Sequence, residues 1–86
     1  MKGKIGLLIN PQKPKALEMA KRLLLWGSEK EVTFLAPPHE AAVLGIPGIS
    51  DEDWKAQVEF AVVLGGDGTF LRAARYVLGR DIPLYG

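Results

Sequence analysis

Short runs of apolar residues divide the chain into candidate strands. The clearest runs are residues 5–9 (Ile-Gly-Leu-Leu-Ile) and 60–64 (Phe-Ala-Val-Val-Leu), and weaker runs occupy residues 32–35 and 82–85. Residues 60–64 show no alternation of apolar and polar positions, which is typical of a parallel strand buried on both faces, and five residues suit a strand better than a helix. The pattern therefore predicts four strands, of which the first and third are buried.

Two longer segments have helical periodicity. The first is predicted to run from about Lys15 to Trp26 and to stop at Gly27, with charged residues on one side. Leu25 falls on the charged side, where we expect an isolated exposed residue. The apolar residues cover about half of the circumference, as in a helix that lies on a sheet: Ala16, Leu17, Met19, Ala20, Leu23, Leu24 and Trp26.

The second periodic segment follows residue 69, with Gly79 as a candidate C-cap. Between the two helices the pattern weakens to a short helical turn at residues 40–44 and a capped first turn that begins at Ser50. The second helix places Arg72, Arg75 and Tyr76 on one side. Its apolar residues share one continuous arc: Phe70, Leu71, Ala73, Ala74, Val77 and Leu78.

Strands that alternate with helices predict an α/β fold, a doubly wound and Rossmann-like, mainly parallel sheet with helices on both faces. Helices on opposite faces give the strand order 2-1-3-4, although 3-2-1-4 stays open. In the first order, residues 10–13 and 65–69 face each other across one crevice, at the point where open α/β sheets bind ligands. Because the strand at residues 82–85 is followed only by Gly86, we expect residues 1–86 to be an incomplete N-terminal domain.

A glycine-rich loop joins the third strand to the second helix, and it is the main candidate site. Its glycines lack the Cβ atoms that would keep a ligand away from the backbone. We expect Thr69 to be the N-cap, so that loop amides and helix dipole together bind an anion such as phosphate. The candidate binding residues are Gly65, Gly66, Asp67, Gly68, Thr69 and Arg72.

Two charged residues of this segment are unusual for a simple anion site. Asp67 would repel a phosphate unless it positions a hydroxyl, accepts a proton or binds a metal, which makes it the catalytic candidate. If Thr69 caps the helix, Arg72 lies in the first turn, where the dipole disfavours a cation by about 0.3–1 kcal/mol, and it could reach back to a phosphate. The alternative for the glycine-rich loop is a hairpin or a structural turn that binds no ligand. The alternative for Arg72 and Arg75 is a solvated helix face, which is our interpretation of Arg75.

Composition excludes several classes of function. A net charge of +1 gives no reason to expect nucleic acid or a membrane surface as partner, and no apolar run approaches the length of a membrane span. The chain has no cysteine, and its one histidine, His39, reads as a surface turn residue, so we expect no protein metal site. The acids of residues 51–53 suit a helical first turn, and Lys13 reads as a solvated loop residue. A cytoplasmic location is the default.

The loop and its continuation carry a family resemblance. Residues 65–69 (Gly-Gly-Asp-Gly-Thr), followed by residues 70–75 (Phe-Leu-Arg-Ala-Ala-Arg), resemble the signature of NAD kinases. Diacylglycerol and sphingosine kinases share the Gly-Gly-Asp-Gly core, but they are expected to carry Asn-Glu soon after the threonine. The turn at residues 10–13 (Asn-Pro-Gln-Lys) also resembles that of many bacterial NAD kinases. The P-loop lysine is absent, and the third glycine of a Rossmann fingerprint would fall at Leu71.

This resemblance implies that a phosphoryl group passes from ATP or polyphosphate to the 2′-hydroxyl of the adenosine ribose of NAD, giving NADP. Asp67 would orient and deprotonate that hydroxyl, residues 65–69 would hold phosphate, and Arg72 would contact a phosphate of NAD. Mg²⁺ would be carried mainly by the nucleotide phosphates. NAD kinases continue into a β-rich domain that residues 1–86 lack. Residues 1–86 would then be the N-terminal nucleotide-binding domain of the kinase, and we expect them to be inactive alone. The family also tends to form homo-oligomers.

Two other functions stay open. A lipid kinase of the same superfamily would use the same loop but would have no dinucleotide for Arg72 to hold. A non-catalytic nucleotide-binding module would bind nucleotide without turnover.

Overall fold

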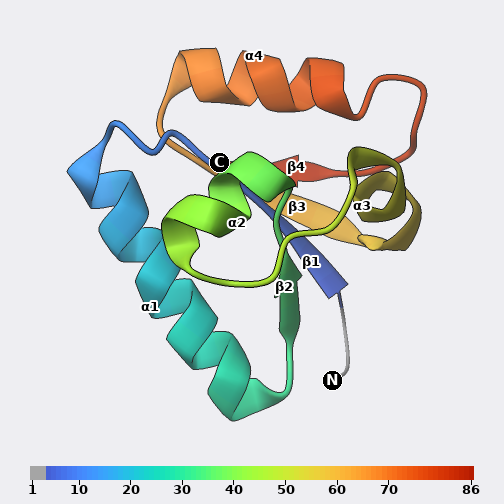
Figure 1. Cartoon of the computed structure of the whole chain (residues 1–86). Helices are drawn as coiled ribbons and strands as arrows, with labels where there is room; N and C mark the ends of the chain where they lie inside the picture. Colours follow the sequence, from blue (N-terminus) through green and yellow to red (C-terminus); the bar gives the residue numbers. More distant parts are fainter. Residues whose placement is uncertain (1–3) are drawn as a thin grey trace.

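A computed structural model describes residues 4–86. The elements follow one another as β1 (Lys4–Ile9), α1 (Pro14–Lys30), β2 (Thr33–Leu35), α2 (Pro38–Leu44), α3 (Asp51–Gln57), β3 (Phe60–Leu64), α4 (Asp67–Tyr76) and β4 (Leu84–Tyr85). The strands form one parallel sheet in the order β2-β1-β3-β4 (Figure 1). This confirms the α/β fold and the strand order 2-1-3-4, and it excludes the alternative 3-2-1-4.

Strand β1 lies at the centre of the sheet and pairs on both sides. Its first half is in register with β2, from Lys4 opposite Thr33, while residues 5–9 run beside all of β3 and end with Ile9 opposite Leu64. The side chains of residues 7–9 are fully buried. Because β1 and β3 end at the same level, the loops that follow them leave the sheet side by side.

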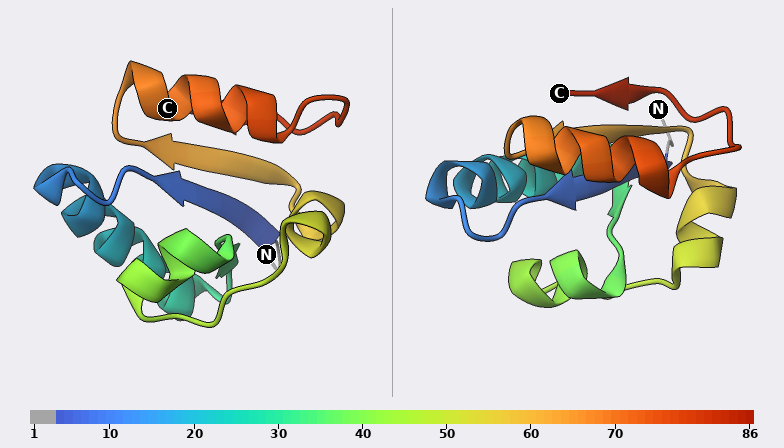
Figure 2. Two further views of the ribbon diagram at one scale, coloured as in Figure 1. Left: turned by 45° about the horizontal axis from the view of Figure 1, so that its top comes forward. Right: turned by 90° about the horizontal axis from the view of Figure 1, so that it is seen from above.

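Helices cover both faces of the sheet, as predicted (Figure 2). Helix α1 packs with Leu7 and Ile9 on one face, whereas α3 and α4 pack with Leu8 and Val63 on the other. The prediction that β3 is buried on both faces is wrong. Its residues alternate: Ala61 and Val63 are buried on the face of α3 and α4, whereas Phe60, Val62 and Leu64 are only partly buried on the face of α1.

Trp54 anchors α3 to the sheet. The indole is fully buried, and its Nε1 donates a hydrogen bond to the Leu35 carbonyl oxygen at 2.7 Å. The ring lies directly on Gly6, where a Cβ would come within 2.3 Å of Trp54 Cζ2. Tyr76 of α4 packs edge-on against the same ring, with centroids 5.0 Å apart. One aromatic side chain thus links α3 and α4 to β1 and β2.

Helix α1 is longer than the sequence predicts. Gly27 lies inside the helix, and a Cβ there would come within 2.7 Å of the Phe34 ring, so this glycine permits close packing instead of ending the helix. The left-handed residue after the helix is Glu31, with φ of 58°. Met19 and Trp26 belong to the predicted apolar face but are nearly half exposed, whereas Leu25 is exposed as expected.

Helix α4 also differs from its prediction, both at its end and in its buried side. It ends at Tyr76 with Val77 as C-cap, so Gly79, with φ of 81°, turns the chain beyond the helix and does not cap it. The buried residues of the helix are Thr69 and Ala73. The helix packs on β3 and β1, so the flank directed away from this pair stays uncovered, and part of the predicted apolar arc is exposed there: Phe70, Leu71, Ala74 and Leu78.

Candidate functional site

The loops after β1 and β3 enclose one cavity of about 600 Å³ at the carboxyl end of the sheet. This is the crevice that the strand order 2-1-3-4 predicts. Residues 10–13 lie across the cavity from the glycine loop, as predicted, whereas His39 was read as a surface turn residue and was not expected to line it. The lining residues are Ile9, Asn10, Pro11, Gln12, Lys13, His39, Gly65, Asp67, Gly68, Thr69 and Arg72.

Asn10 joins the two loops and shapes the first of them. Its amide donates to the Leu64 carbonyl oxygen at 2.9 Å, which ties the end of β1 to the end of β3. Its side-chain Oδ1 accepts a hydrogen bond from the Gln12 amide at 3.0 Å, and its carbonyl oxygen accepts one from the Lys13 amide at 3.1 Å. These bonds form an Asx turn that brings the chain back toward the glycine loop.

Gly65 and Gly66 are required by the path of the backbone. Gly65 has φ of 139°, and a Cβ there would come within 2.6 Å of the Asn10 Cβ and 2.8 Å of Thr69 Oγ1. Gly66 has φ of 108° and is the N-cap of α4. Both dihedral angles are unfavourable for other residues. The first two glycines therefore have a structural role, independent of any ligand.

The prediction that Thr69 caps the helix is wrong. Helix α4 begins two residues earlier, at Asp67, so Thr69 is the third helical residue and is buried. No side chain caps the helix, and the first helical backbone bond runs from the Phe70 amide to the Gly66 carbonyl oxygen at 3.0 Å. The amides of residues 66–69 therefore have no acceptor within the helix. An uncapped helix start that lines a cavity is suited to bind an anion.

Gly68 has no comparable structural role. It is the second residue of α4, it is not among the residues with positive φ, and a Cβ at this position would meet no other atom within 4 Å. Glycine in a helix is less stable than alanine by about 0.5–1 kcal/mol. Since Gly68 also lines the cavity, the missing side chain leaves the helix amides open to a ligand.

Asp67 is the first residue of α4 and lines the cavity. An acid at this position is favoured by the helix dipole, so Asp67 has a structural explanation as well as a chemical one. It is the only carboxylate among the lining residues of this cavity. Within residues 4–86, the ion pair of Arg72 is with Glu40 and not with Asp67.

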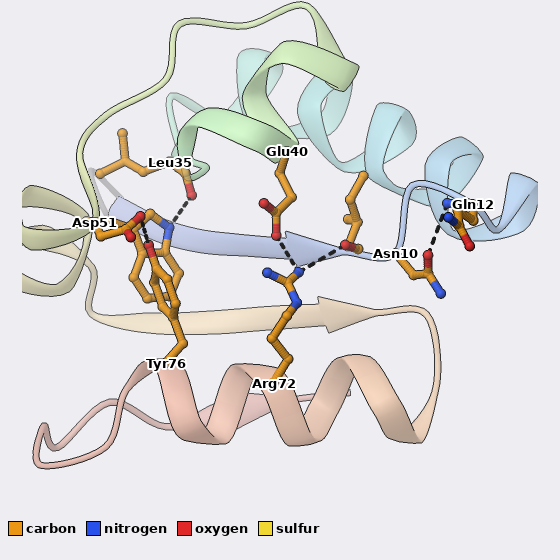
Figure 3. Close-up of polar contacts among 9 residues, drawn as sticks. Asn10, Gln12, Leu35, Glu40, Asp51, Arg72 and Tyr76 are labelled. Carbon is orange, nitrogen blue, oxygen red and sulfur yellow. Dashed lines mark hydrogen bonds and ion pairs between the residues drawn. The ribbon is translucent and has the colours of Figure 1, made fainter.

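Arg72 lies in the second turn of α4, not in the first, since the helix begins at Asp67. Its Nη2 donates to Glu40 Oε2 at 2.6 Å and to the Ile9 carbonyl oxygen at 3.2 Å (Figure 3). The arginine is half exposed and the glutamate is buried, with 1% exposure. Arg72 thus crosses the end of β1 to α2 while it lines the cavity, an arrangement that sequence reasoning missed because Glu40 reads as an ordinary acid in a short helix.

Lys13 lies closer to the glycine loop than the sequence suggests. Its Nζ is 3.3 Å from the position that a Cβ on Gly66 would occupy, and the side chain lines the cavity while it stays exposed. His39 of α2 is exposed and also lines the cavity. The cavity therefore gathers three basic side chains beside the uncapped start of α4, which suits an anionic ligand.

Residues 51–53 form the first turn of α3, where the Ser50 hydroxyl oxygen accepts a hydrogen bond from the Asp53 amide at 3.2 Å. This confirms the predicted cap. Within residues 4–86, no group of three histidine, aspartate or glutamate side chains is arranged to hold a metal ion. The same part of the chain contains no helix long and apolar enough to cross a membrane.

Comparison with known proteins identifies the family. Residues 49–86 match the ATP-NAD kinase N-terminal domain. The chain is 36% identical over 83 residues to the NAD kinase of Geobacter metallireducens, 39% over 83 residues to that of Heliobacterium modesticaldum and 38% over 85 residues to that of Moorella thermoacetica.

These alignments cover 95–96% of this chain but only 27–29% of the three relatives, so the chain spans less than a third of their length. They include both loops that enclose the cavity, and the family match contains the whole of the glycine loop and α4. The chain therefore belongs to the NAD kinase family, in which it corresponds to part of the N-terminal domain.

Proposed function

We propose that the natural polypeptide that carries this chain transfers a phosphoryl group from ATP or polyphosphate to the 2′-hydroxyl of the adenosine ribose of NAD. The product is NADP. The family supports the substrates, and the observation that carries the site is the open wall at Gly68, where uncapped helix amides line a cavity without a side chain in front of them. We further propose that residues 1–86 are inactive alone and that the whole polypeptide forms homo-oligomers in the cytoplasm.

Three groups at the cavity then have chemical roles: the amides at the start of α4, the Asp67 carboxylate and the Arg72 guanidinium. The amides of residues 66–69 bind phosphate oxygens, because they point out of the start of α4 and have no acceptor within it. Asp67, in the same turn, orients the acceptor hydroxyl and takes its proton as the new bond between that oxygen and phosphorus forms. The bond between phosphorus and the bridging oxygen of the donor breaks in the same step, and ADP or the shortened polyphosphate leaves. Arg72 contacts a phosphate of the dinucleotide from the cavity wall.

The cavity suits a metal that the nucleotide brings with it. Its one carboxylate, Asp67, cannot by itself provide the oxygen ligands of Mg²⁺, so most of these ligands must come from phosphate and water. When bound, the ion would neutralise charge on the transferred phosphoryl group. Asp67 is the one carboxylate of the cavity lining that could contact it.

The test is NADP formation from NAD and Mg-ATP by the longest natural polypeptide that contains residues 1–86. We expect Asp67→Asn to leave the fold intact and to lower turnover by about 10²-fold or more. A loss below threefold would remove Asp67 from catalysis. Diacylglycerol serves as the control acceptor: phosphorylation of the lipid without NADP formation would replace the proposed function by that of a lipid kinase.

A further inference from the structure

Glu40 is the acidic side chain that the proposed reaction does not use, and it is buried beside the cavity. Its exposure is 1%, and Oε2 accepts a hydrogen bond from Arg72 Nη2 at 2.6 Å. The two residues are 32 positions apart in the sequence and belong to α2 and α4, which the carboxyl end of β1 separates (Figure 3). The pair is therefore a specific long-range contact, unlike the exposed pair of Glu18 and Arg22 within α1.

Stability alone is a weak explanation for this pair. A carboxylate loses its hydration when it is buried, and attraction to an arginine often does no more than offset that loss. Here the arginine is half exposed, so solvent weakens the attraction further. An apolar residue at position 40 would fill the same space without this cost.

The geometry of the arginine suggests what the glutamate does. Within residues 4–86, both hydrogen bonds of Arg72 use Nη2, one to Glu40 and one to the Ile9 carbonyl oxygen. A guanidinium is planar and rigid, so two bonds at one nitrogen orient the whole group. Nη1 and Nε are then left without a protein acceptor in this part of the chain, on a side chain that lines the cavity.

We propose that Glu40 is a positioning residue, which holds the Arg72 guanidinium at the cavity wall so that Nη1 and Nε meet a phosphate of the bound dinucleotide. This inference rests on the proposed function. Glu40 touches no substrate itself, and its effect passes through Arg72. It should therefore change the affinity for NAD and leave the rate of phosphoryl transfer almost unchanged.

Kinetics of the longest natural polypeptide test the first part of this proposal. We expect Glu40→Gln, which keeps the shape of the side chain but removes its charge, to raise KM for NAD about tenfold, the loss of one charge-assisted hydrogen bond, with kcat within threefold. Glu18→Gln is the matched control, because it also breaks an arginine pair, but on the exposed side of α1. It should leave both constants unchanged.

A second comparison separates positioning from a structural role. If Glu40 acts through Arg72, the guanidinium loses its phosphate contact in Glu40→Gln, and removing the arginine as well should add little. Glu40→Gln and the double variant Glu40→Gln/Arg72→Gln should then have the same KM for NAD within about twofold. The double variant leaves no buried charge unpaired, so it avoids the folding defect expected of Arg72→Gln alone. A lower melting temperature with KM unchanged or decreased in Glu40→Gln would overturn the proposal.

Motion of the arginine gives a readout that needs no activity. ¹⁵N relaxation of the Arg72 Nε–H group should report a rigid side chain in the wild type and a mobile one in Glu40→Gln, with no change in Glu18→Gln. Equal mobility in wild type and Glu40→Gln would refute positioning, whatever the substrate is. Absence of NADP formation by the wild type would refute the proposed function, and with it the role of the dinucleotide phosphate.

Discussion

The substitution Gly68→Ala separates what the fold requires from what a ligand requires. Gly68 is the second residue of α4, and a Cβ there would meet no atom of residues 4–86 within 4 Å apart from its chain neighbours and the adjacent backbone of α4. Alanine is more stable than glycine in a helix interior by about 0.5–1 kcal/mol, and less of this difference applies in the first turn. The free energy of unfolding should therefore stay the same or rise by at most about 1 kcal/mol.

The effect on the proposed reaction should be in the opposite direction. The new methyl group would stand at the cavity wall, beside the amides of residues 66–69, and a phosphate bound there would have to shift. A displacement of about 1 Å from the productive geometry can cost about 10²-fold in rate. We therefore expect NADP formation by Gly68→Ala to fall by about 10²-fold while the melting temperature is unchanged or higher.

Steady-state NADP formation and thermal unfolding followed by circular dichroism, both on the longest natural polypeptide, measure the two effects. Gly45→Ala is the matched control. It also adds a methyl group with no neighbour within 4 Å. Because Gly45 has φ of 72°, this variant should lose about 1 kcal/mol of stability. Because Gly45 does not line the cavity, the variant should keep its activity. The two alanine variants thus have opposite expected outcomes.

Two results would refute the argument. If Gly68→Ala kept turnover within threefold of the wild type, no ligand would approach the start of α4 at this point. If turnover and melting temperature fell together, the methyl group would be meeting atoms of the polypeptide outside residues 1–86, and the open wall would belong to a protein interface.

Two other predictions concern stability: one tests the glycine loop, and the other tests the hydrogen bond between Tyr76 of α4 and Asp51 of α3. Gly65→Ala should destabilise the protein by about 2–4 kcal/mol in urea unfolding, because its φ is 139° and the new Cβ would come within 2.6 Å of Asn10 Cβ; a loss below 1 kcal/mol would contradict this. Burial, and then the hydrogen bond to Asp51, raise the pKa of the Tyr76 hydroxyl above its ordinary value near 10. The hydroxyl therefore keeps its proton to a higher pH in the folded state than in the unfolded state. The contribution of Tyr76 to the free energy of unfolding is complete below about pH 10 and is lost as the pH rises further. Tyr76→Phe should be less stable than wild type at pH 7 by about 0.5–1.5 kcal/mol, and the difference should narrow from pH 10 to 11; a constant difference would contradict this.

The sheet could be predicted from the sequence because its signals are local. Buried parallel strands appear as uninterrupted apolar runs, and alternation with helices restricts the connections to a few right-handed orders. The order 2-1-3-4 and the meeting of residues 10–13 with residues 65–69 both follow from that reasoning, and the structure confirms them. The partial exposure of Phe60, Val62 and Leu64 did not follow, because it depends on how side chains from other elements pack on that face of the sheet.

The ends of the helices could not be predicted, because one residue type serves two purposes. Gly27 resembles a helix terminator, but it is where α1 packs against Phe34. Thr69 resembles an N-cap, but the backbone already turns at Gly66, so the threonine lies inside the helix and is buried. Only the position of a distant partner separates these roles, and a pattern along the chain does not contain it.

Arg72 shows the same limit for the candidate site. It was predicted to reach back toward the glycine loop, and it does line the cavity beside that loop, although from the second turn of α4 and not from the first. Its ion pair was not, since Glu40 lies in another helix and nothing in its neighbourhood in the sequence marks it as buried. Spacing along one helix indicates which side chains share a face, whereas contacts across the sheet depend on the tertiary structure.

The three glycines of residues 65–68 belong to one sequence motif, but each is required for a different reason. Gly65 makes room for Asn10, and Gly66 adopts a dihedral angle that starts α4, so any protein with this crossing of loops would need both. Gly68 is required neither for close packing nor for a positive φ, and a glycine at this position makes the helix less stable. A residue that the fold does not require, at the wall of the cavity and beside unpaired amides, is best explained by a ligand, so Gly68 supports a phosphate site more strongly than the motif as a whole does.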